Sequence, residues 1–151
     1  MQNHIEEVGL IKRIHHISIV VRDIEEALTT YQRALGLSLT EIQERPDLAA
    51  RIAFLHTGES EIELVQPVTS DTGEAKFLRK RGEGIHHICL EVDDIEQALA
   101  DLREKGLQLT DETPRLGPKG ERFAFIHPKS AHGVLIELYE RLKLEAAHDS
   151  Q

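Results

Sequence analysis

The sequence has one cysteine, no apolar run close to the roughly 20 residues that span a bilayer, and no excess of positive charge. The single Cys89 excludes a disulfide within the chain, and its place in an apolar pattern predicts a buried thiol. The formal net charge of -9 argues against nucleic acid as the partner, because phosphate binding relies on clustered positive charge. The first residues contain no apolar segment typical of a secretion signal, so the expected location is cytoplasmic.

What is present is an internal repeat. The 151 residues are 40% hydrophobic and 30% charged, as in an ordinary globular protein. Residues 14–28, IHHISIVVRDIEEAL, match residues 85–99, IHHICLEVDDIEQAL, at ten of fifteen positions. The match continues as RIAFLH with RFAFIH, and as residues 62–64 with residues 136–138. The chain is therefore a duplicated module.

Each copy predicts a strand, a helix and three further strands. A β-branched run precedes apolar residues at helical spacing, which begin at an Asp suited to capping and end at Gly36 or Gly106. Short strands are expected at 37–41, 51–56 and 61–66, and again near 107–111, 122–127 and 134–139. The predicted fold class is α+β, with tandem βαβββ modules at residues 12–67 and 84–141. Residues 68–83 form a linker with a short helix, and residues 142–151 a flexible tail.

Strand parity selects four side chains with metal-ligating chemistry. Neighbouring side chains on a strand point to opposite faces, so the row with Ile17 and Ile19 packs under the helix and His16 faces a cleft. The same alternation places Glu63 opposite its two core neighbours, and the second copy repeats both results. The predicted metal ligands are His16, Glu63, His87 and Glu137. Two imidazoles and two carboxylates suit one divalent ion, Co, Mn, Zn, Ni or Mg, with positions left for substrate or water.

Other polar residues have weaker claims. A strand histidine is more often a hydrogen-bonded structural residue, which is the expectation for His15 and His86. The repeat mates His56 and His127 suit supporting roles around the ligands. Basic residues gather at KFLRKR and in the later loop region, where they form a solvated surface or meet the phosphates of a nucleotide-like carrier.

These motifs resemble those of a known family. A repeated βαβββ order with a His on each first strand and an acid on each last strand resembles the vicinal-oxygen-chelate superfamily. The segments GEGIHHICLEVDDIEQAL, DETPRLGPKGERFAFIHPKS and HGVLIELYE are similar to its methylmalonyl-CoA epimerases. The resemblance, which runs from about residue 13 to 140, implies a curved, partly closed mixed sheet around a metal cleft, and a homodimer. It also implies an isomerase that interconverts (2R)- and (2S)-methylmalonyl-CoA through a metal-stabilised enolate, with the four residues selected by parity as ligands.

One departure from the family leaves the acid/base residues open. Some members carry a glutamate in a strand motif such as GVREAML, whereas this sequence has AARIAFL, with Ile52 at that position. Proton transfer at the two faces of C2 is therefore assigned to Glu137 and Glu44, with Asp47 or Glu61 as alternatives to Glu44. The candidates for holding the phosphates of coenzyme A are Lys76, Arg122 and Lys129.

Two other kinds of function use the same residues differently. Another enzyme of this fold, a glyoxalase-like isomerase or an iron dioxygenase, would use the same cleft, although the second carboxylate argues against a dioxygenase with two histidines and one acid. A non-catalytic small-molecule binding protein would need no metal ligands, so metal content separates it from an enzyme.

Overall fold

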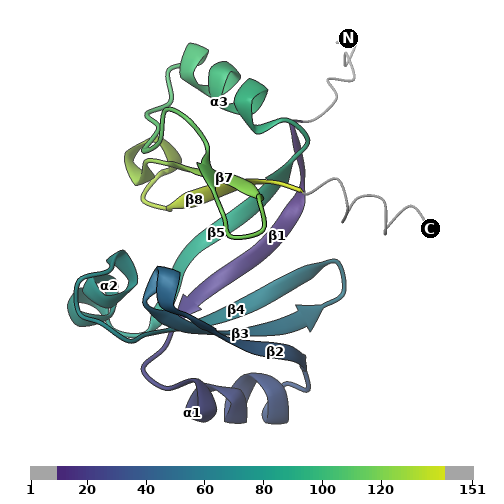
Figure 1. Ribbon diagram of the computed structural model, residues 1–151, viewed down its shortest axis with the longest axis vertical. Helices are drawn as coiled ribbons and strands as arrows, with labels where there is room; N and C mark the ends of the chain where they lie inside the picture. The colour runs from purple at the N-terminus through teal and green to yellow at the C-terminus, as the bar shows by residue number, and fades with distance from the viewer. Residues whose placement is uncertain (1–9, 142–151) are drawn as a thin grey trace. The chain divides into compact units, whose positions relative to one another are not determined.

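The computed structural model describes residues 10–141 (Figure 1). The elements are β1 (Ile11–Val20), α1 (Ile24–Leu28), η1 (Thr29–Ala34), β2 (Ser38–Arg45), η2 (Pro46–Leu48), β3 (Ala50–Thr57), β4 (Ser60–Pro67), α2 (Gly73–Arg81), β5 (Gly84–Val92), α3 (Ile95–Glu104), β6 (Arg115–Leu116), β7 (Arg122–Ile126), η3 (Pro128–Ala131) and β8 (Ile136–Glu140). The predicted order of strand, helix and three strands occurs in both copies, with α2 between them. The tail expected at 142–151 lies outside the described residues.

All eight strands belong to one mixed sheet, in the order β2-β3-β4-β1-β5-β8-β7-β6. β1 and β4 are parallel, whereas the pairs β2 with β3, β3 with β4, β6 with β7 and β7 with β8 are antiparallel. Mixed pairing together with helices outside the sheet confirms the predicted α+β class.

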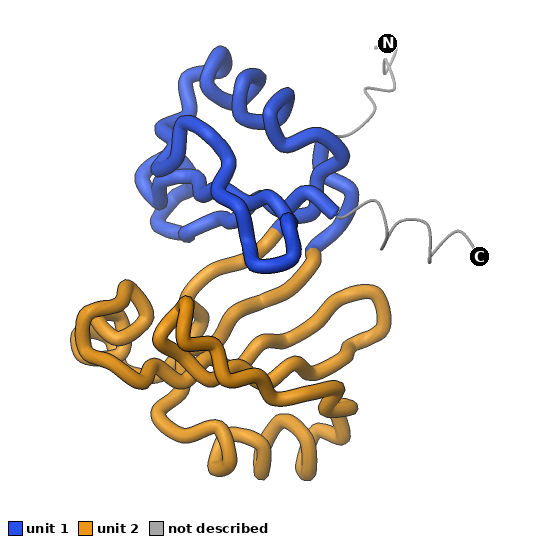
Figure 2. Tube along the Cα trace, in the orientation of Figure 1, with its two compact units in different colours: residues 1–14, 90–151 blue, residues 15–89 orange. Residues whose placement is uncertain are grey.

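The chain divides into two compact units (Figure 2). Unit 2 is residues 15–89, and unit 1 combines residues 1–14 with 90–151, of which 10–14 and 90–141 are described. The first strand of each repeat, β1 or β5, runs from one unit into the other. The unit boundaries therefore fall inside these two strands and differ from the module boundaries expected at 12–67 and 84–141.

The core of unit 2 lies between α1 and one face of its strands. Asp23 begins the helix by accepting a hydrogen bond from the Glu26 backbone N–H. After α1 the chain continues as the wider turns of η1, and the helical segment ends at Gly36, whose φ of 77° favours glycine. The buried core residues are Val21, Ile24, Leu28, Ala53, Leu55 and Leu64, with Ile19 and Ile62 packed against them.

Unit 1 is built in the same way around α3. Its buried core residues are Val92, Ile95, Ala98, Leu99, Ala124, Ile126 and Leu138. The strand predicted near 107–111 is reduced to a single bridge between Leu109 and Ile126, and β6 begins only at Arg115. The Asp111 carboxylate explains this difference, because it accepts from the Phe125 backbone N–H and from Arg115 Nε. The Asp111 side chain thus accepts the hydrogen bond that the backbone of a longer strand would accept.

The linker between the copies contains the predicted short helix, α2. The Thr72 hydroxyl accepts from the Ala75 backbone N–H at its start, and the helix ends at Gly82, whose φ is 80°. Between residues 10 and 141, no helix is long and apolar enough to cross a membrane.

Candidate metal centre

Three of the four predicted ligands meet within unit 2. His16 on β1 has its Nε2 2.6 Å from Glu63 Oε2, on β4. The same nitrogen lies 3.4 Å from Nε2 of His87, on β5, and the two imidazole rings meet edge to face. His16 is buried, and Glu63 and His87 are half-buried. Two imidazole nitrogens and one carboxylate oxygen therefore converge in a place that is partly shielded from water.

Strand register explains why Glu63 reaches His16. β1 and β4 run parallel, with Ser18 paired to Glu63 and Ile19 to Leu64. Side chains in register on adjacent strands point to the same face, so Glu63 shares the face of Ser18 and His16. Ile19 and Leu64 point the other way, into the core beneath α1. This is the alternation that the sequence predicts.

The two imidazoles have the spacing of ligands to one divalent cation, whereas Glu63 lies at hydrogen-bond distance from His16 and would have to move back to share an ion with it. Two nitrogens that each lie about 2.0–2.1 Å from a tetrahedral ion are separated by about 3.3–3.4 Å, and the two Nε2 atoms are 3.4 Å apart. The Nδ1 atom of each ring is engaged elsewhere, 2.9 Å from Nδ1 of the preceding histidine. Both rings thus direct Nε2 toward the shared group. A mixed set of nitrogen and oxygen donors suits Zn, Co, Ni or Mn.

Glu137 occupies the equivalent place in unit 1. It lies on β8 in register with Phe125, just as Glu63 lies on β4 in register with Phe54. Its neighbour Leu138 is buried in the core of unit 1, so Glu137 points to the opposite face of the strand. Within its own unit, Glu137 repeats the position of Glu63.

Two further residues lie on the ligand face, and neither was predicted from the sequence to take part in the site. The Ser18 hydroxyl is buried, and within residues 10–141 it has no hydrogen-bond partner. Its repeat mate Cys89 is 0% exposed, which confirms the predicted buried thiol. Its Sγ and one ring nitrogen each of His15 and His16 lie within 4.8 Å of one another. Ser18 and Cys89 each lie two residues after a predicted ligand, His16 or His87. This repeated spacing is the sequence feature that could have placed them on the ligand face.

Glu44 lies on the other face of the sheet. It is in register with Arg51, and the Arg51 Nε donates to its carboxylate at 2.8 Å. Arg51 also contacts Glu25 of α1 at 2.9 Å, and this hydrogen bond lowers the pKa of Glu25 to about 2. Glu44 on β2 and Arg51 on β3 thus share the side of the sheet that faces α1, opposite to the face of Glu63. This placement corrects the expectation that Glu44 serves the cleft.

The alternatives to Glu44 differ in their surroundings. Arg45 hydrogen-bonds the Asp47 carboxylate and lowers its pKa, which makes Asp47 a weaker proton acceptor. Glu61 is in register with His16 and shares the face of Glu63. Ile52, at the position of the family glutamate, is 6% exposed on that face. Of Glu44 and its two alternatives, Glu61 is thus the carboxylate that the strand register places on the ligand face.

The three basic residues predicted to hold the phosphates of coenzyme A do not form one cluster. Arg122 begins β7, where Glu140 lies 3.1 Å and Glu96 3.7 Å from its guanidinium nitrogens. Lys129 is exposed and follows the other end of β7, so about 13 Å of strand separates the two positions. Lys76 is exposed on α2, in unit 2.

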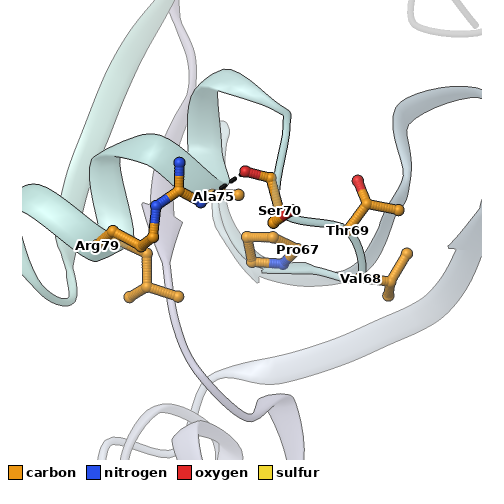
Figure 3. Close-up of a pocket in the computed structure, with 7 residues that line it drawn as sticks. Pro67, Val68, Thr69, Ser70, Ala75 and Arg79 are labelled. Atoms are coloured by element: carbon orange, nitrogen blue, oxygen red, sulfur yellow. Dashed lines mark hydrogen bonds between the residues drawn. The ribbon is translucent and has the colours of Figure 1, made fainter.

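Unit 2 also contains an open hollow of about 390 Å³ between α2 and the loop that follows β4 (Figure 3). Its lining residues are Pro67, Val68, Thr69, Ser70, Ala75, Leu78 and Arg79. Arg79 crosses one side of it and donates to the Ser70 carbonyl oxygen at 2.5 Å. None of the site residues predicted from the sequence lines this hollow.

The fold is that of a known protein superfamily. Residues 15–125 match the glyoxalase/bleomycin resistance protein/dioxygenase superfamily. The chain belongs to this superfamily.

Within it, the chain is similar to epimerases of coenzyme A esters. The ethylmalonyl-CoA/methylmalonyl-CoA epimerase of Cereibacter sphaeroides is 37% identical over 131 residues, which are 85% of this chain and 98% of the relative. The crystal structure of methylmalonyl-CoA epimerase from Mycobacterium tuberculosis is 36% identical, with a TM-score of 0.83, and the match covers 95% of this chain and 97% of that one. A methylmalonyl-CoA epimerase in complex with methylmalonyl-CoA and NH4+ is 33% identical, with a TM-score of 0.80 and coverage of 88% and 96%. These similarities support an enzyme of the epimerase class.

Proposed function

We propose that this enzyme interconverts (2R)- and (2S)-methylmalonyl-CoA and that it depends on one divalent metal ion. The observation that carries the proposal is the convergence of His16, Glu63 and His87 on one face, with the two imidazole nitrogens at the spacing of metal ligands. Glu137, at the equivalent repeat position, is the proposed fourth ligand. The similarity to methylmalonyl-CoA epimerases supports the choice of substrate.

A divalent cation bound by these side chains supplies Lewis-acid stabilisation of the negative charge that develops on the substrate oxygens as C2 loses its proton. His16 and Ser18 are both buried on this face, so a substrate bound beside them would be partly shielded from bulk water. A dry site strengthens every electrostatic contact with the developing charge. The Ser18 hydroxyl, for which the described residues offer no partner, is suited to donate a hydrogen bond to a substrate oxygen.

Epimerisation requires that a proton leave from one face of C2 and return on the other. We assign one of these transfers to Glu61, because it shares the strand face of His16 and Glu63. The second transfer is assigned to Glu137. Ile52 provides no titratable group at the position where some family members have a glutamate, and Glu61, in register with His56 rather than with Ile52, is the proposed acid on this face.

Coenzyme A carries phosphates that need cationic partners. Lys76 and Lys129 are exposed and suited to this role, whereas Arg122 is fixed by Glu96 and Glu140 and contributes only if it leaves these carboxylates. The homodimer and the cytoplasmic location expected from the sequence belong to the same proposal. Size-exclusion chromatography with light scattering tests the dimer, because a chain of 17.1 kDa elutes at twice that mass only when paired.

The decisive experiment is isotope exchange. Metal-free protein is loaded with Co2+, Mn2+, Zn2+, Ni2+ or Mg2+ and incubated with (2R)- or (2S)-methylmalonyl-CoA in deuterated water, and C2 deuterium and the epimer ratio are followed by NMR. The expected result is metal-dependent exchange that ends at a mixture of epimers. The variant His16→Ala, which removes a proposed ligand, is expected to lose both the C2 exchange and the epimerisation.

Parallel reactions separate the proposal from its rivals. Ethylmalonyl-CoA tests the size of the acyl group, a glutathione hemithioacetal tests a glyoxalase-like isomerase, and a catechol with Fe2+ and oxygen tests a dioxygenase. Metal-loaded protein that exchanges no C2 proton of either malonyl ester would refute the epimerase. Protein that binds none of the ions tightly would refute the metal dependence.

A further inference from the structure

A histidine and a glutamate stand behind the metal-facing ring of His87. The Nδ1 atom of His87 lies 2.9 Å from Nδ1 of His86. On the far side of the His86 ring, Nε2 lies 3.6 Å from Oε1 of Glu74, in the first turn of α2. The Phe77 ring, one turn further along α2, packs edge to face against His86. All four residues belong to unit 2, so this chain of contacts is complete within one compact unit.

The contacts allow one arrangement of protons when His87 faces a metal. A metal-binding Nε2 must be unprotonated, so the single proton of the neutral His87 ring is on Nδ1. That N–H donates to His86 Nδ1, which must then be an acceptor. The proton of the neutral His86 ring is left on Nε2, which faces the Glu74 carboxylate. At 3.6 Å this last contact is longer than a direct hydrogen bond, so Glu74 acts on the N–H mainly through its charge.

We propose that Glu74 and His86 are positioning residues for the metal centre, which hold the His87 ring in the tautomer and orientation that present Nε2 to the ion. The inference rests on the proposed metal site. Histidine ligands of metals almost always donate their second N–H to a fixed acceptor, and loss of such a partner weakens metal affinity about 10- to 100-fold. Here the acceptor is a second imidazole, and a carboxylate outside the strand orients it.

The helix that carries Glu74 is held firmly enough for this role. Thr72 caps its first turn, and Ala75 is 5% exposed, so the turn that contains Glu74 is anchored on both sides. The Glu74 side chain is 29% exposed and that of His86 11%. The segment between the two repeats therefore does more than connect them, because it supplies the carboxylate end of the contact chain.

The test measures metal affinity by titration calorimetry, with Co2+ and Zn2+, on folded variants checked by circular dichroism. Glu74→Gln keeps the size of the side chain and removes its charge. The matched control is Glu26→Gln, which removes the same charge from the first turn of α1, where no metal-ligating residue is contacted. His86→Asn keeps an acceptor oxygen where Nδ1 was, and His86→Leu removes it.

We expect His86→Leu, which removes the direct partner of His87, to weaken metal binding about 10- to 100-fold. Glu74→Gln and His86→Asn, which each remove only the outer contact between Glu74 and His86, should weaken it less, and Glu26→Gln should bind as the wild type does. In the Zn2+-loaded wild type, 15N NMR should find the ring proton of His87 on Nδ1 and that of His86 on Nε2. Wild-type affinity in both Glu74→Gln and His86→Leu would overturn the inference and leave the proposed metal site intact. If the wild type binds no divalent ion, the proposed function falls, and the inference falls with it.

Discussion

Replacing Glu63 tests the metal centre at the contact that defines it. Glu63 Oε2 lies 2.6 Å from His16 Nε2, and the Glu63 side chain is 15% exposed, so its charge is partly shielded from water. Removing a residue that only supports a metal ligand costs about 10- to 100-fold in metal affinity, and removing a ligand itself should cost at least as much. We therefore expect Glu63→Ala to bind a divalent ion at least about 10-fold more weakly than the wild type.

Glu63→Gln separates charge from geometry. The amide oxygen keeps a donor atom in place but carries no negative charge, so its affinity should fall between those of the wild type and Glu63→Ala. The assay is calorimetric titration of metal-free protein with Co2+ or Mn2+, followed by C2 deuterium exchange at saturating metal. Equal affinity in all three proteins would refute the assignment of Glu63 as a ligand. A fall in melting temperature without a change in affinity would assign Glu63 a purely structural role.

Three further predictions concern other parts of unit 2. Glu61→Gln should slow C2 exchange about 100- to 10,000-fold, the usual effect of losing a general base, whereas Glu44→Gln, on the opposite face, should leave the rate unchanged; equal rates in the two variants would contradict the assignment. Arg51→Gln should return the pKa of Glu25 from about 2 toward its ordinary 4.5 in an NMR titration. Because folding lowers this pKa, the stabilisation is present above about pH 4.5 and disappears as the pH falls toward 2, and the variant should lose that part of the acid sensitivity. Leu64→Ala should cost about 2–5 kcal/mol in urea unfolding, because the side chain is 0% exposed in the core beneath α1; a cost below about 1 kcal/mol would mean that the core rearranges to fill the space.

The metal ligands could be selected from the sequence because they depend on local rules. Alternation along a strand is fixed by the backbone, so Ile62 and Leu64 in the core oblige Glu63 to face the other way. The repeat provides a second, independent copy of the same pattern, and Glu137 has the same register to its neighbouring strand as Glu63. Two copies of one local rule are enough to identify the ligand positions without any knowledge of how the strands pair.

The acid/base residue could not be selected in this way. β2 has a bulge between Leu39 and Glu41, and a bulge changes which residues of a strand share a face. Beyond the bulge, Glu44 therefore pairs with Arg51 on the side of the sheet that faces α1. The sequence of this polar strand does not show which of its acids lie on which face. The strand predicted near 107–111 is reduced for a similar reason, a contact that is distant in sequence. The Asp111 side chain accepts from the Phe125 backbone N–H, fourteen residues away.

The sequence by itself determined the duplicated βαβββ order, the helix caps and the strand face on which the four proposed ligands lie, because each of these follows from spacing within a few residues. Only the tertiary structure decided that Nε2 of His16 and His87 meet at 3.4 Å and that Glu74 lies behind His86. The first contact joins β1 to β5, and the second joins β5 to the linker helix α2. Their distances depend on register and packing, which no local pattern along the chain contains.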